Sequence, residues 1–575
     1  MDAMDDLTEP QEELPEVSYG AEALSGRRDV TTRINSLLGR KGEYWADTAA
    51  DAVEQHFPDE QVYTSAAGIS PSGIVHFGNF RDVMTSLAVH ETLKKRGKPA
   101  RFLFSWDDFD RFRKVPVGVD PSFEQYIGMP YTSVPDPAGE LDSYALRFQE
   151  QFMEAMQQCD IEMEYRYQTQ EYGSGRYDDA IIDCLQQREE IAKIILSFMS
   201  GKGKEMKGIN EKRYIEEYYP ISVYSRFSGK DSTNITDYDG GSIVRYTCQE
   251  TGKIDEVDLR EEHIAKLAWK VDWPMRWKAE GVVFEPGGAD HASPGGSYDT
   301  SHAIAKEIFG RQGPVFIGYE FIGLRGLKGK MSGSKGQAMS PSQLLRLFEP
   351  ELLKWLYLRR HPGQKFELAF DSETIRQYAE FDKQRSSFGF LPPDTQRSVE
   401  LSVGGTPTED QINAVPFRQV ASLGQIVQWN REKLGDLLGR MNLQYSEQSI
   451  DSRLPRARHW MEEYNPEEII TLLPQVNAAH AGTMDPDVRQ QAAALRSALE
   501  AEPDASIERL ETIVYGIARD PALSDQNNRR RQREFFIHVY QLLIGRNTGP
   551  RLGTFLSVAD RASVLKLLSA GEVPA

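Results

Sequence analysis

A glycine-rich loop near the start of the chain carries a histidine and an asparagine at a spacing that suits phosphate binding. Gly68, Gly73 and Gly78 allow tight turns and a close approach of the backbone to a ligand, and His76 and Asn79 lie three residues apart. An apolar helical pattern follows, so the free N–H groups of a helix start would face this loop. The loop predicts a phosphate site, although a structural strand–helix turn with a hydrogen-bonded His76 explains a single such motif equally well.

A second loop, much later in the chain, carries lysines among small residues. Lys330 and Lys335 are separated by serines and glycines, including Gly333 and Ser334. Two such lysines could close on a polyphosphate and supply positive charge as it leaves. On composition alone, an exposed basic linker would be the better interpretation, so the case depends on where the fold places the two loops.

The strands and helices predicted around these loops place both at one edge of a parallel sheet. A strand, the first loop, a helix and a second strand follow one another within about 45 residues, which is the pattern of a βαβ unit. The second loop follows the last predicted strand. Ligands bind at the carboxyl edge of such sheets, so both loops are expected there. The predicted strands are 61–66, 101–106, 281–284 and 314–319, and the predicted helices are 30–57, 80–97, 263–273 and 297–309.

The chain as a whole predicts an α/β protein with a doubly wound, Rossmann-type catalytic domain, a mixed insertion domain and a C-terminal all-α domain. Its 575 residues suffice for several domains. Ser340-Pro341 predicts a helix start, and the chain after it is mostly helical by its apolar period. The predicted parts are a flexible acidic extension (1–29), the two halves of the catalytic domain (30–120 and 256–322), the insertion (121–255), the lysine loop with a stem-contact region (323–375) and the helical domain (376–575).

Composition excludes several classes of protein. A formal net charge of −20 argues against indiscriminate nucleic-acid binding and against stable DNA binding, but it allows a local basic track. No apolar run is long enough to span a membrane, and the acidic N-terminus lacks the pattern of an export signal. Only three cysteines occur, with no CxxC spacing, so a reducing cytoplasm is the expected location. The basic candidates for contact with RNA are Arg529, Arg530, Arg531, Arg533, Arg546 and Arg551.

Taken together and in order, several motifs resemble those of the class I aminoacyl-tRNA synthetases, and within them the class I lysyl-tRNA synthetases. The first loop resembles the HIGH motif and the second the KMSKS motif, with glycine at the fourth position of the latter. Matching stretches extend over about residues 60–560. The two signatures are Pro71-Ser72-Gly73-Ile74-Val75-His76-Phe77-Gly78-Asn79 and Lys330-Met331-Ser332-Gly333-Ser334, and the further stretches include 107–116, 271–277, 284–299, 319–322 and 549–553.

This resemblance implies a lysine–tRNA ligase that uses ATP with Mg²⁺ and binds the anticodon through its C-terminal helical domain, 376–575. A monomer is expected. Lysine would be activated to its adenylate with release of pyrophosphate and then transferred to the terminal ribose of tRNA(Lys). It places His76 and Asn79 on the phosphate chain and Lys330 on the departing pyrophosphate, helped by Ser334 and Lys335. Further ATP contacts are expected at Gly68, Gly78, Asp290 and His291, of which Asp290 would bind the ribose; a helix-entry loop is the structural alternative there.

Selection of lysine requires a carboxylate and an aromatic wall, because burying an unpaired ammonium costs several kcal/mol. The candidates at strand ends are Asp107, Asp108, Tyr298 and Asp299, and the two adjacent acids could instead cap the next segment. A glutamate-specific relative would need a buried arginine. Some members of the resembling family bind zinc through cysteines in the insertion; here only Cys248 remains of them, so no bound metal is expected.

Two other functions fit parts of the sequence. A small-molecule adenylyltransferase would use the same histidine and lysine loops, but it would have no need for the roughly 200 helical residues after position 375. A binding protein that keeps the fold without its chemistry is disfavoured by the intact His76, Asn79 and Lys330.

Overall fold

A five-stranded parallel sheet forms the centre of the protein. The computed structural model describes residues 32–206, 208–325 and 339–569. The strands lie in the order β10-β9-β1-β2-β3, and every neighbouring pair is parallel. The order reverses beside β1, as it does in doubly wound folds. The fold class expected from the sequence is therefore confirmed. The strands are β1 (Tyr63–Ile69), β2 (Ala100–Trp106), β3 (Glu164–Tyr167), β9 (Val282–Gly288) and β10 (Val315–Tyr319).

Alternating side chains of these strands fill two separate cores, one on each face of the sheet. In β2, Phe102 and Phe104 belong to the core that contains helix α2 (Phe77–Lys95), whereas Leu103 belongs to the core under α9 (Trp269–Glu280) and α11 (Ser297–Glu307). This alternation follows from the two-residue period of a strand. Because both faces are covered, the strands are mostly buried, as parallel strands usually are.

Most elements expected in the catalytic domain are present, but two helices differ from the prediction. Within the described part of 30–57, only a short 3₁₀ turn (Asn35–Leu37) and α1 (Trp45–His56) are helical. The predicted helix 263–273 is wrong: β8 (Ala265–Leu267) comes first, and α9 then continues to Glu280. The helix continues through Pro274, which lies inside α9, because the Lys270 carbonyl oxygen left without the proline N–H accepts a hydrogen bond from the Ser301 hydroxyl at 3.1 Å.

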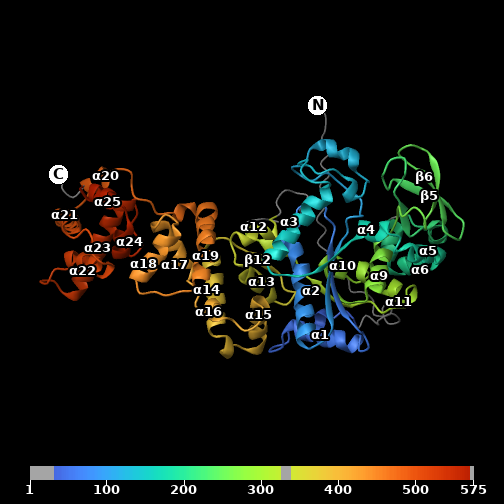
Figure 1. Ribbon diagram of the computed structural model, residues 1–575, viewed down its shortest axis with the longest axis horizontal. Coiled ribbons are helices and arrows are strands. Elements are labelled where there is room, and N and C mark those ends of the chain that lie inside the picture. The colour runs from blue at the N-terminus through green and yellow to red at the C-terminus, as the bar shows by residue number, and fades with distance from the viewer. Residues whose placement is uncertain (1–31, 207, 326–338, 570–575) are drawn as a thin grey trace.

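The insertion combines helices with a small antiparallel sheet, β5-β6-β7, and also supplies β3 to the central sheet. The predicted range 121–255 therefore includes a strand of the catalytic core. Helices α3 and α4 flank β3, and Figure 1 shows β5, β6 and helices α5 and α6 at one end of the molecule. The helices are α3 (Tyr144–Gln158), α4 (Gln168–Gly173), α5 (Asp178–Gln186), α6 (Arg188–Phe198), α7 (Gly201–Met206) and α8 (Glu211–Glu217); the strands are β4 (Ile221–Val223), β5 (Thr233–Tyr238), β6 (Ile243–Cys248) and β7 (Ile254–Asp258).

After the second loop the chain is almost entirely helical, as expected, and Ser340 caps α12 in a capping box. Its helices form two successive groups. Side chains of α12–α15 and α17–α19 join the core of the catalytic domain, whereas α20–α25 surround a core of their own at the far end of the elongated molecule (Figure 1). Among the described residues after the loop, one strand interrupts the helices: β12 (Phe366–Leu368), which pairs in parallel with β11 (Ile322–Leu324) from before the loop.

The first group comprises α12 (Pro341–Leu345), α13 (Pro350–Leu358), α14 (Ser372–Ser386), α15 (Pro393–Val403), α16 (Glu409–Ile412), α17 (Phe417–Ile426), α18 (Arg431–Arg440) and α19 (Glu447–His459). The second comprises α20 (Ala478–Gly482), α21 (Pro486–Ala501), α22 (Ile507–Ala518), α23 (Asp525–Ile544), α24 (Leu552–Val558) and α25 (Arg561–Leu568). None of the helices in the described ranges is long and apolar enough to cross a membrane.

Candidate active site

A cavity of about 110 Å³ opens where the strand order reverses, between β1, β2 and β9, and is covered by α9. Its mouth includes Gly68, Asp107 and Gly288 at the carboxyl ends of these strands, and its deeper wall includes Leu103 and Val282. Ligands of open α/β sheets bind at this position. The first predicted loop leaves β1 beside this mouth and leads directly into α2.

The geometry of the first loop explains its glycines. His76 is the N-cap of α2, and its Nδ1 accepts a hydrogen bond from the Gly78 N–H at 3.1 Å. A Cβ on Gly78 would lie 2.9 Å from the His76 ring, and a Cβ on Gly68 would lie 3.0 Å from the carbonyl oxygen of Ser105. His76 therefore has the structural role that was considered as an alternative from the sequence, because it is hydrogen-bonded in the strand–helix turn and caps the helix. This contact also fixes the imidazole at the start of a helix, where an anion is favoured.

Two acids of the site, the buried Asp82 and the half-buried Glu285, were not predicted from the sequence. Asp82 accepts a hydrogen bond from the Gly68 N–H at 3.2 Å, and Glu285 accepts one from the Trp277 indole N–H at 2.6 Å. Both line the cavity. In the described ranges neither forms an ion pair with a lysine or arginine at contact distance. Glu285 could have been singled out from the sequence, because it lies in the stretch 284–299 that resembles the family. Nothing in the sequence placed Asp82 near it.

Burial and neighbouring charges raise the pKa values of these two acids. Burial raises the pKa of Asp82 well above its usual range, and the neighbouring Glu285 carboxyl raises it further. Burial likewise raises the pKa of Glu285 to about 7, although indole N–H donors and Arg276 oppose the shift. A bound cation would relieve both effects, because it would favour the ionised form of each carboxyl.

An aromatic wall of tryptophans from α9 faces these acids. Trp269 and Trp273 stack with ring centroids 5.0 Å apart and planes 19° apart, and Trp277 follows one turn later. All three line the cavity, with His291 next to Trp273 at 5.8 Å between ring centroids. Such a wall suits an aliphatic stem that ends in a cation.

A buried charge network closes the site on the side of the insertion. Arg276 donates to Asp107 at 2.6 Å and contacts Asp272 at 3.0 Å. Lys266 contacts Asp272 at 3.3 Å and Asp110 at 2.8 Å. Asp110 in turn accepts a hydrogen bond from the Ser70 hydroxyl at 3.0 Å, in the first loop. Three carboxylates thus share two cations, and the network joins β8 and α9 to the loop that carries His76.

The three acids and the tyrosine that were expected to select lysine have different environments. Asp107 lines the cavity, paired with Arg276. Asp108 does not line it; it accepts hydrogen bonds from the Thr169 N–H (2.8 Å) and from Gln149, and burial raises its pKa to about 6. Tyr298 is fully buried and donates to the Pro314 carbonyl oxygen, and Asp299 pairs with Arg33. For these last three residues the structure shows packing and anchoring contacts outside the cavity.

The residues expected to bind ATP are only partly described. His291 lines the cavity, whereas Asp290, next to it on the short helix α10 (Ala289–Ala292), is exposed and does not line it. Asn79 lies in the first turn of α2. Lys330, Ser334 and Lys335, with the rest of the KMSKS-like motif, lie outside the described residues.

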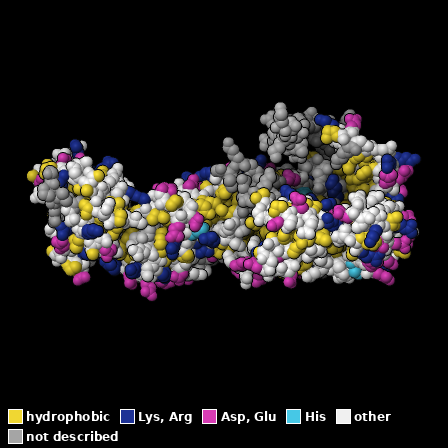
Figure 2. Space-filling model, turned by 90° about the horizontal axis from the view of Figure 1, so that it is seen from above, with side chains coloured by type: hydrophobic (Ala, Val, Ile, Leu, Met, Phe, Trp, Pro, Cys, Tyr) yellow, Lys and Arg dark blue, Asp and Glu magenta, His cyan; other side chains and the backbone are white. Residues whose placement is uncertain are grey.

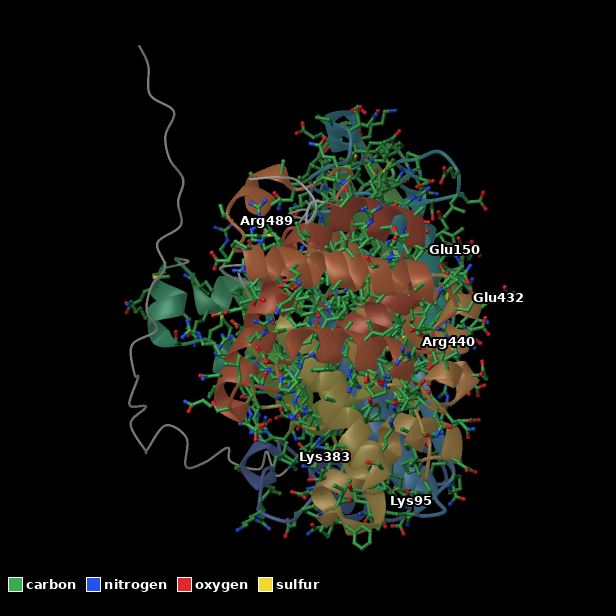
Figure 3. All side chains as sticks on the ribbon, turned by 90° about the vertical axis from the view of Figure 1, so that its left-hand side faces the viewer. Lys95, Glu150, Lys383, Glu432, Arg440 and Arg489 are labelled. Atoms are coloured by element: carbon green, nitrogen blue, oxygen red, sulfur yellow. The ribbon has the colours of Figure 1, made fainter. Side chains whose placement is uncertain are left out.

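The six arginines considered for RNA contact are also divided by the structure. Arg529, Arg530 and Arg533 are exposed on α23, although Arg530 pairs with Glu534. Arg531 pairs with Asp487, Arg551 pairs with Glu511, and Arg546 donates to two backbone carbonyl oxygens. Figure 2 shows basic and acidic side chains scattered over the face in view, and Figure 3 shows Arg440, Glu432 and Arg489 at the periphery of the helical end. No continuous basic face is visible in these views.

Two turns of the insertion meet at Cys248. Ser225 and Ser228 in one turn, and Thr251 in the other, have the spacing that paired cysteines have in zinc knuckles. The Ser228 hydroxyl lies 3.6 Å from the Cys248 sulfur. Although burial alone would raise the pKa of the Cys248 thiol, hydrogen bonds from these hydroxyls lower it to about 6. Three hydroxyls and one thiol do not fit a structural zinc ion, and the described residues contain no group of three or more His, Cys, Asp or Glu that could hold a metal.

A doubly wound sheet with a HIGH-like loop leaving its first strand, beside a cavity at the strand reversal, defines the class I tRNA synthetase architecture. The profile of the family described as "tRNA synthetases class I (K)" matches residues 43–401. The chain therefore belongs to this family and is an aminoacyl-tRNA synthetase.

Curated relatives match almost the entire chain. The lysine–tRNA ligase of Pyrococcus horikoshii is 35% identical over 541 residues, covering 91% of this chain and 99% of that protein. The lysine–tRNA ligase of Streptomyces coelicolor is also 35% identical, covering 91% and 98%. That of Treponema pallidum is 33% identical, covering 92% and 99%.

Proposed function

We propose that this synthetase activates L-lysine with ATP and transfers it to tRNA(Lys). The observation that carries the choice of lysine is the pair of cavity-lining acids, the buried Asp82 and the half-buried Glu285, beside the wall of tryptophans. An ammonium on an aliphatic stem would supply the missing positive charge and pack against the indoles. The family membership and the names of the relatives support the same substrate.

The charges of the cavity also disfavour the opposite substrate. A glutamate side chain would bring a further negative charge next to Asp82, Glu285 and Asp107. The two arginines that line the cavity, Arg166 and Arg276, are already paired with Glu280 and Asp107. Like charges in a poorly solvated site repel strongly. The proposed site therefore selects for a cationic amino acid and against an anionic one.

The first reaction needs no general base in this proposal. The lysine carboxylate is already ionised when it attacks the α-phosphorus of ATP, and pyrophosphate leaves. Catalysis then depends on alignment and on positive charge near the phosphates. His76 and Asn79, at the start of α2, are assigned to the phosphate chain, and Lys330 to the departing pyrophosphate. ATP would enter as its Mg²⁺ complex, which neutralises part of the phosphate charge.

The second reaction transfers lysine from the adenylate to a terminal ribose hydroxyl of the tRNA. We assign the helices after residue 375 to tRNA recognition, with the exposed Arg529 and Arg533 of α23 as the first candidates for phosphate contacts. The protein is expected to act as a cytoplasmic monomer.

The test is amino-acid-dependent exchange of pyrophosphate into ATP, measured with each of the twenty amino acids, followed by charging of total tRNA. Lysine should give the dominant exchange and should then be attached to tRNA(Lys). Exchange with glutamate or arginine in place of lysine would refute the proposed substrate, and exchange without charging would refute the second step.

A further inference from the structure

One buried polar atom of the cavity has no use in the function proposed so far. Gln168, the first residue of α4, lines the cavity although it belongs to the insertion, and it is only 2% exposed. Its Nε2 donates to the Ser105 hydroxyl at 2.8 Å, whereas its Oε1 is buried and has no hydrogen-bond partner among the described residues. An unsatisfied buried acceptor costs stability, so it is an indication of a missing partner.

The backbone next to Gln168 is firmly held. Asp108, at the end of β2, accepts a hydrogen bond from the Thr169 N–H at 2.8 Å and another from Gln149 at 3.0 Å. The anchored Thr169 directly follows Gln168, and the amide of Gln168 is fixed by Ser105 on its other side. Asp108 therefore acts through α4, and the side chain of Gln168 cannot easily turn away from the cavity.

The neighbours of Gln168 place it at the Asp107 end of the cavity. The same Arg276 nitrogen, Nη1, contacts the Ser105 hydroxyl at 2.9 Å and Asp107 at 2.6 Å. The amide of Gln168 and the carboxylate of Asp107 are thus linked through Ser105 and Arg276. Asp82, on α2, instead accepts a hydrogen bond from the N–H of Gly68 in β1.

We propose that Gln168 binds the α-ammonium of the amino-acid substrate, with its Oε1 accepting a hydrogen bond beside the Asp107 carboxylate. This assignment rests on the proposed function. An amide oxygen only accepts hydrogen bonds, so its partner must be a donor and cannot be the substrate carboxylate. Lysine offers two donors of this strength, and the proposed function places its ε-ammonium at Asp82 and Glu285. The α-ammonium remains for the Asp107 end.

The experiment removes the acceptor and, separately, the donor. The dissociation constants of L-lysine, cadaverine and 6-aminohexanoate are measured by calorimetry for the full chain and for Gln168→Leu. Cadaverine keeps both ammonium groups, whereas 6-aminohexanoate lacks the α-ammonium. Q168L should weaken lysine and cadaverine about 10- to 100-fold, as expected for a hydrogen bond to a charged group, and should leave 6-aminohexanoate unchanged.

A matched control is available in α14. Gln377 is 6% exposed and its Oε1 is also buried and without a partner, but it does not line the cavity. Q377L should change none of the three affinities, and its melting temperature calibrates the structural effect of the substitution. Equal weakening of 6-aminohexanoate by Q168L, or no weakening of lysine and cadaverine, would overturn the assignment. Absence of lysine-dependent exchange in the unaltered chain would refute the proposed function instead, because the assignment is judged from binding alone.

Discussion

The affinity for lysine should depend on pH through Glu285. Burial raises the pKa of this carboxyl to about 7, whereas a glutamate in the unfolded chain titrates near 4.3. If the carboxylate must be ionised to bind the ε-ammonium, lysine competes with a proton for the site. Binding should therefore weaken as the pH falls through the pKa of the free enzyme, and it should level off above it.

The magnitude follows from the fraction of ionised Glu285. With a pKa near 7, about one tenth of the carboxyl is ionised at pH 6 and about nine tenths at pH 8. The dissociation constant for lysine should therefore rise about tenfold between pH 8 and pH 6, and the slope should approach tenfold per pH unit further below the pKa. The raised pKa of Asp82 would extend this dependence to still higher pH. The assay is calorimetric binding of L-lysine between pH 5.5 and 8.5, without ATP.

Two variants separate Glu285 from its surroundings. Glu285→Gln should bind lysine more weakly and show a smaller slope below neutrality, because only the contribution of Asp82 remains. Asp108→Asn is the control, because burial raises the pKa of Asp108 to about 6 but its carboxyl lies outside the cavity. D108N should keep the slope of the wild type. The reasoning would be refuted if E285Q kept the slope of the wild type, or if the affinity of the wild type for lysine did not change between pH 6 and pH 8.

Three further predictions concern other parts of the molecule. His76→Ala should slow pyrophosphate exchange at least tenfold while filter binding shows nearly unchanged tRNA affinity; a normal exchange rate would remove its assigned role. Arg529→Ala should weaken tRNA binding and lower its salt dependence, measured from 50 to 200 mM salt, whereas Arg531→Ala should do so less because Arg531 already pairs with Asp487; the reverse order would count against α23 as a tRNA surface. Metal analysis should find no zinc in the unaltered chain and about one zinc per chain after Ser225, Ser228 and Thr251 are all replaced with cysteine. Zinc in the unaltered chain would contradict this prediction.

The elements of the catalytic domain could be predicted because their signals are local. The strand 101–106, the helix after the first loop and the Ser340-Pro341 helix start each depend on apolar period or capping chemistry within one segment, and all three are found. The short strand β8 could not be predicted in this way. Its pairing with β4, more than 40 residues earlier in the chain, makes it a strand, and its three residues are too few to show a period.

The candidate site shows the same division between local and distant information. His76 and Asn79 could be located from their loop, whereas Asp82 was hidden in the helix behind it and becomes part of the site only because β9 lies next to β1. Conversely, Asp107 and Asp108 looked equivalent in the sequence. Adjacent residues at a strand end point in different directions, and one faces the cavity while the other anchors α4.

In the proposed site, Asp82 and Glu285 are expected to lower the stability of the fold and to increase the discrimination between substrates. Asp82 and Glu285 line the same cavity and form no ion pair with a lysine or arginine among the described residues; burial raises the pKa of both, and Glu285 raises that of Asp82 further. Replacing both with apolar residues would be expected to stabilise the fold, because buried charges rarely repay their desolvation. Their retention is understandable if a cationic substrate completes the site. A neutral isostere such as norleucine would leave both carboxyls unpaired, so rejection of it would come from the enzyme's own unpaired groups and not from a clash.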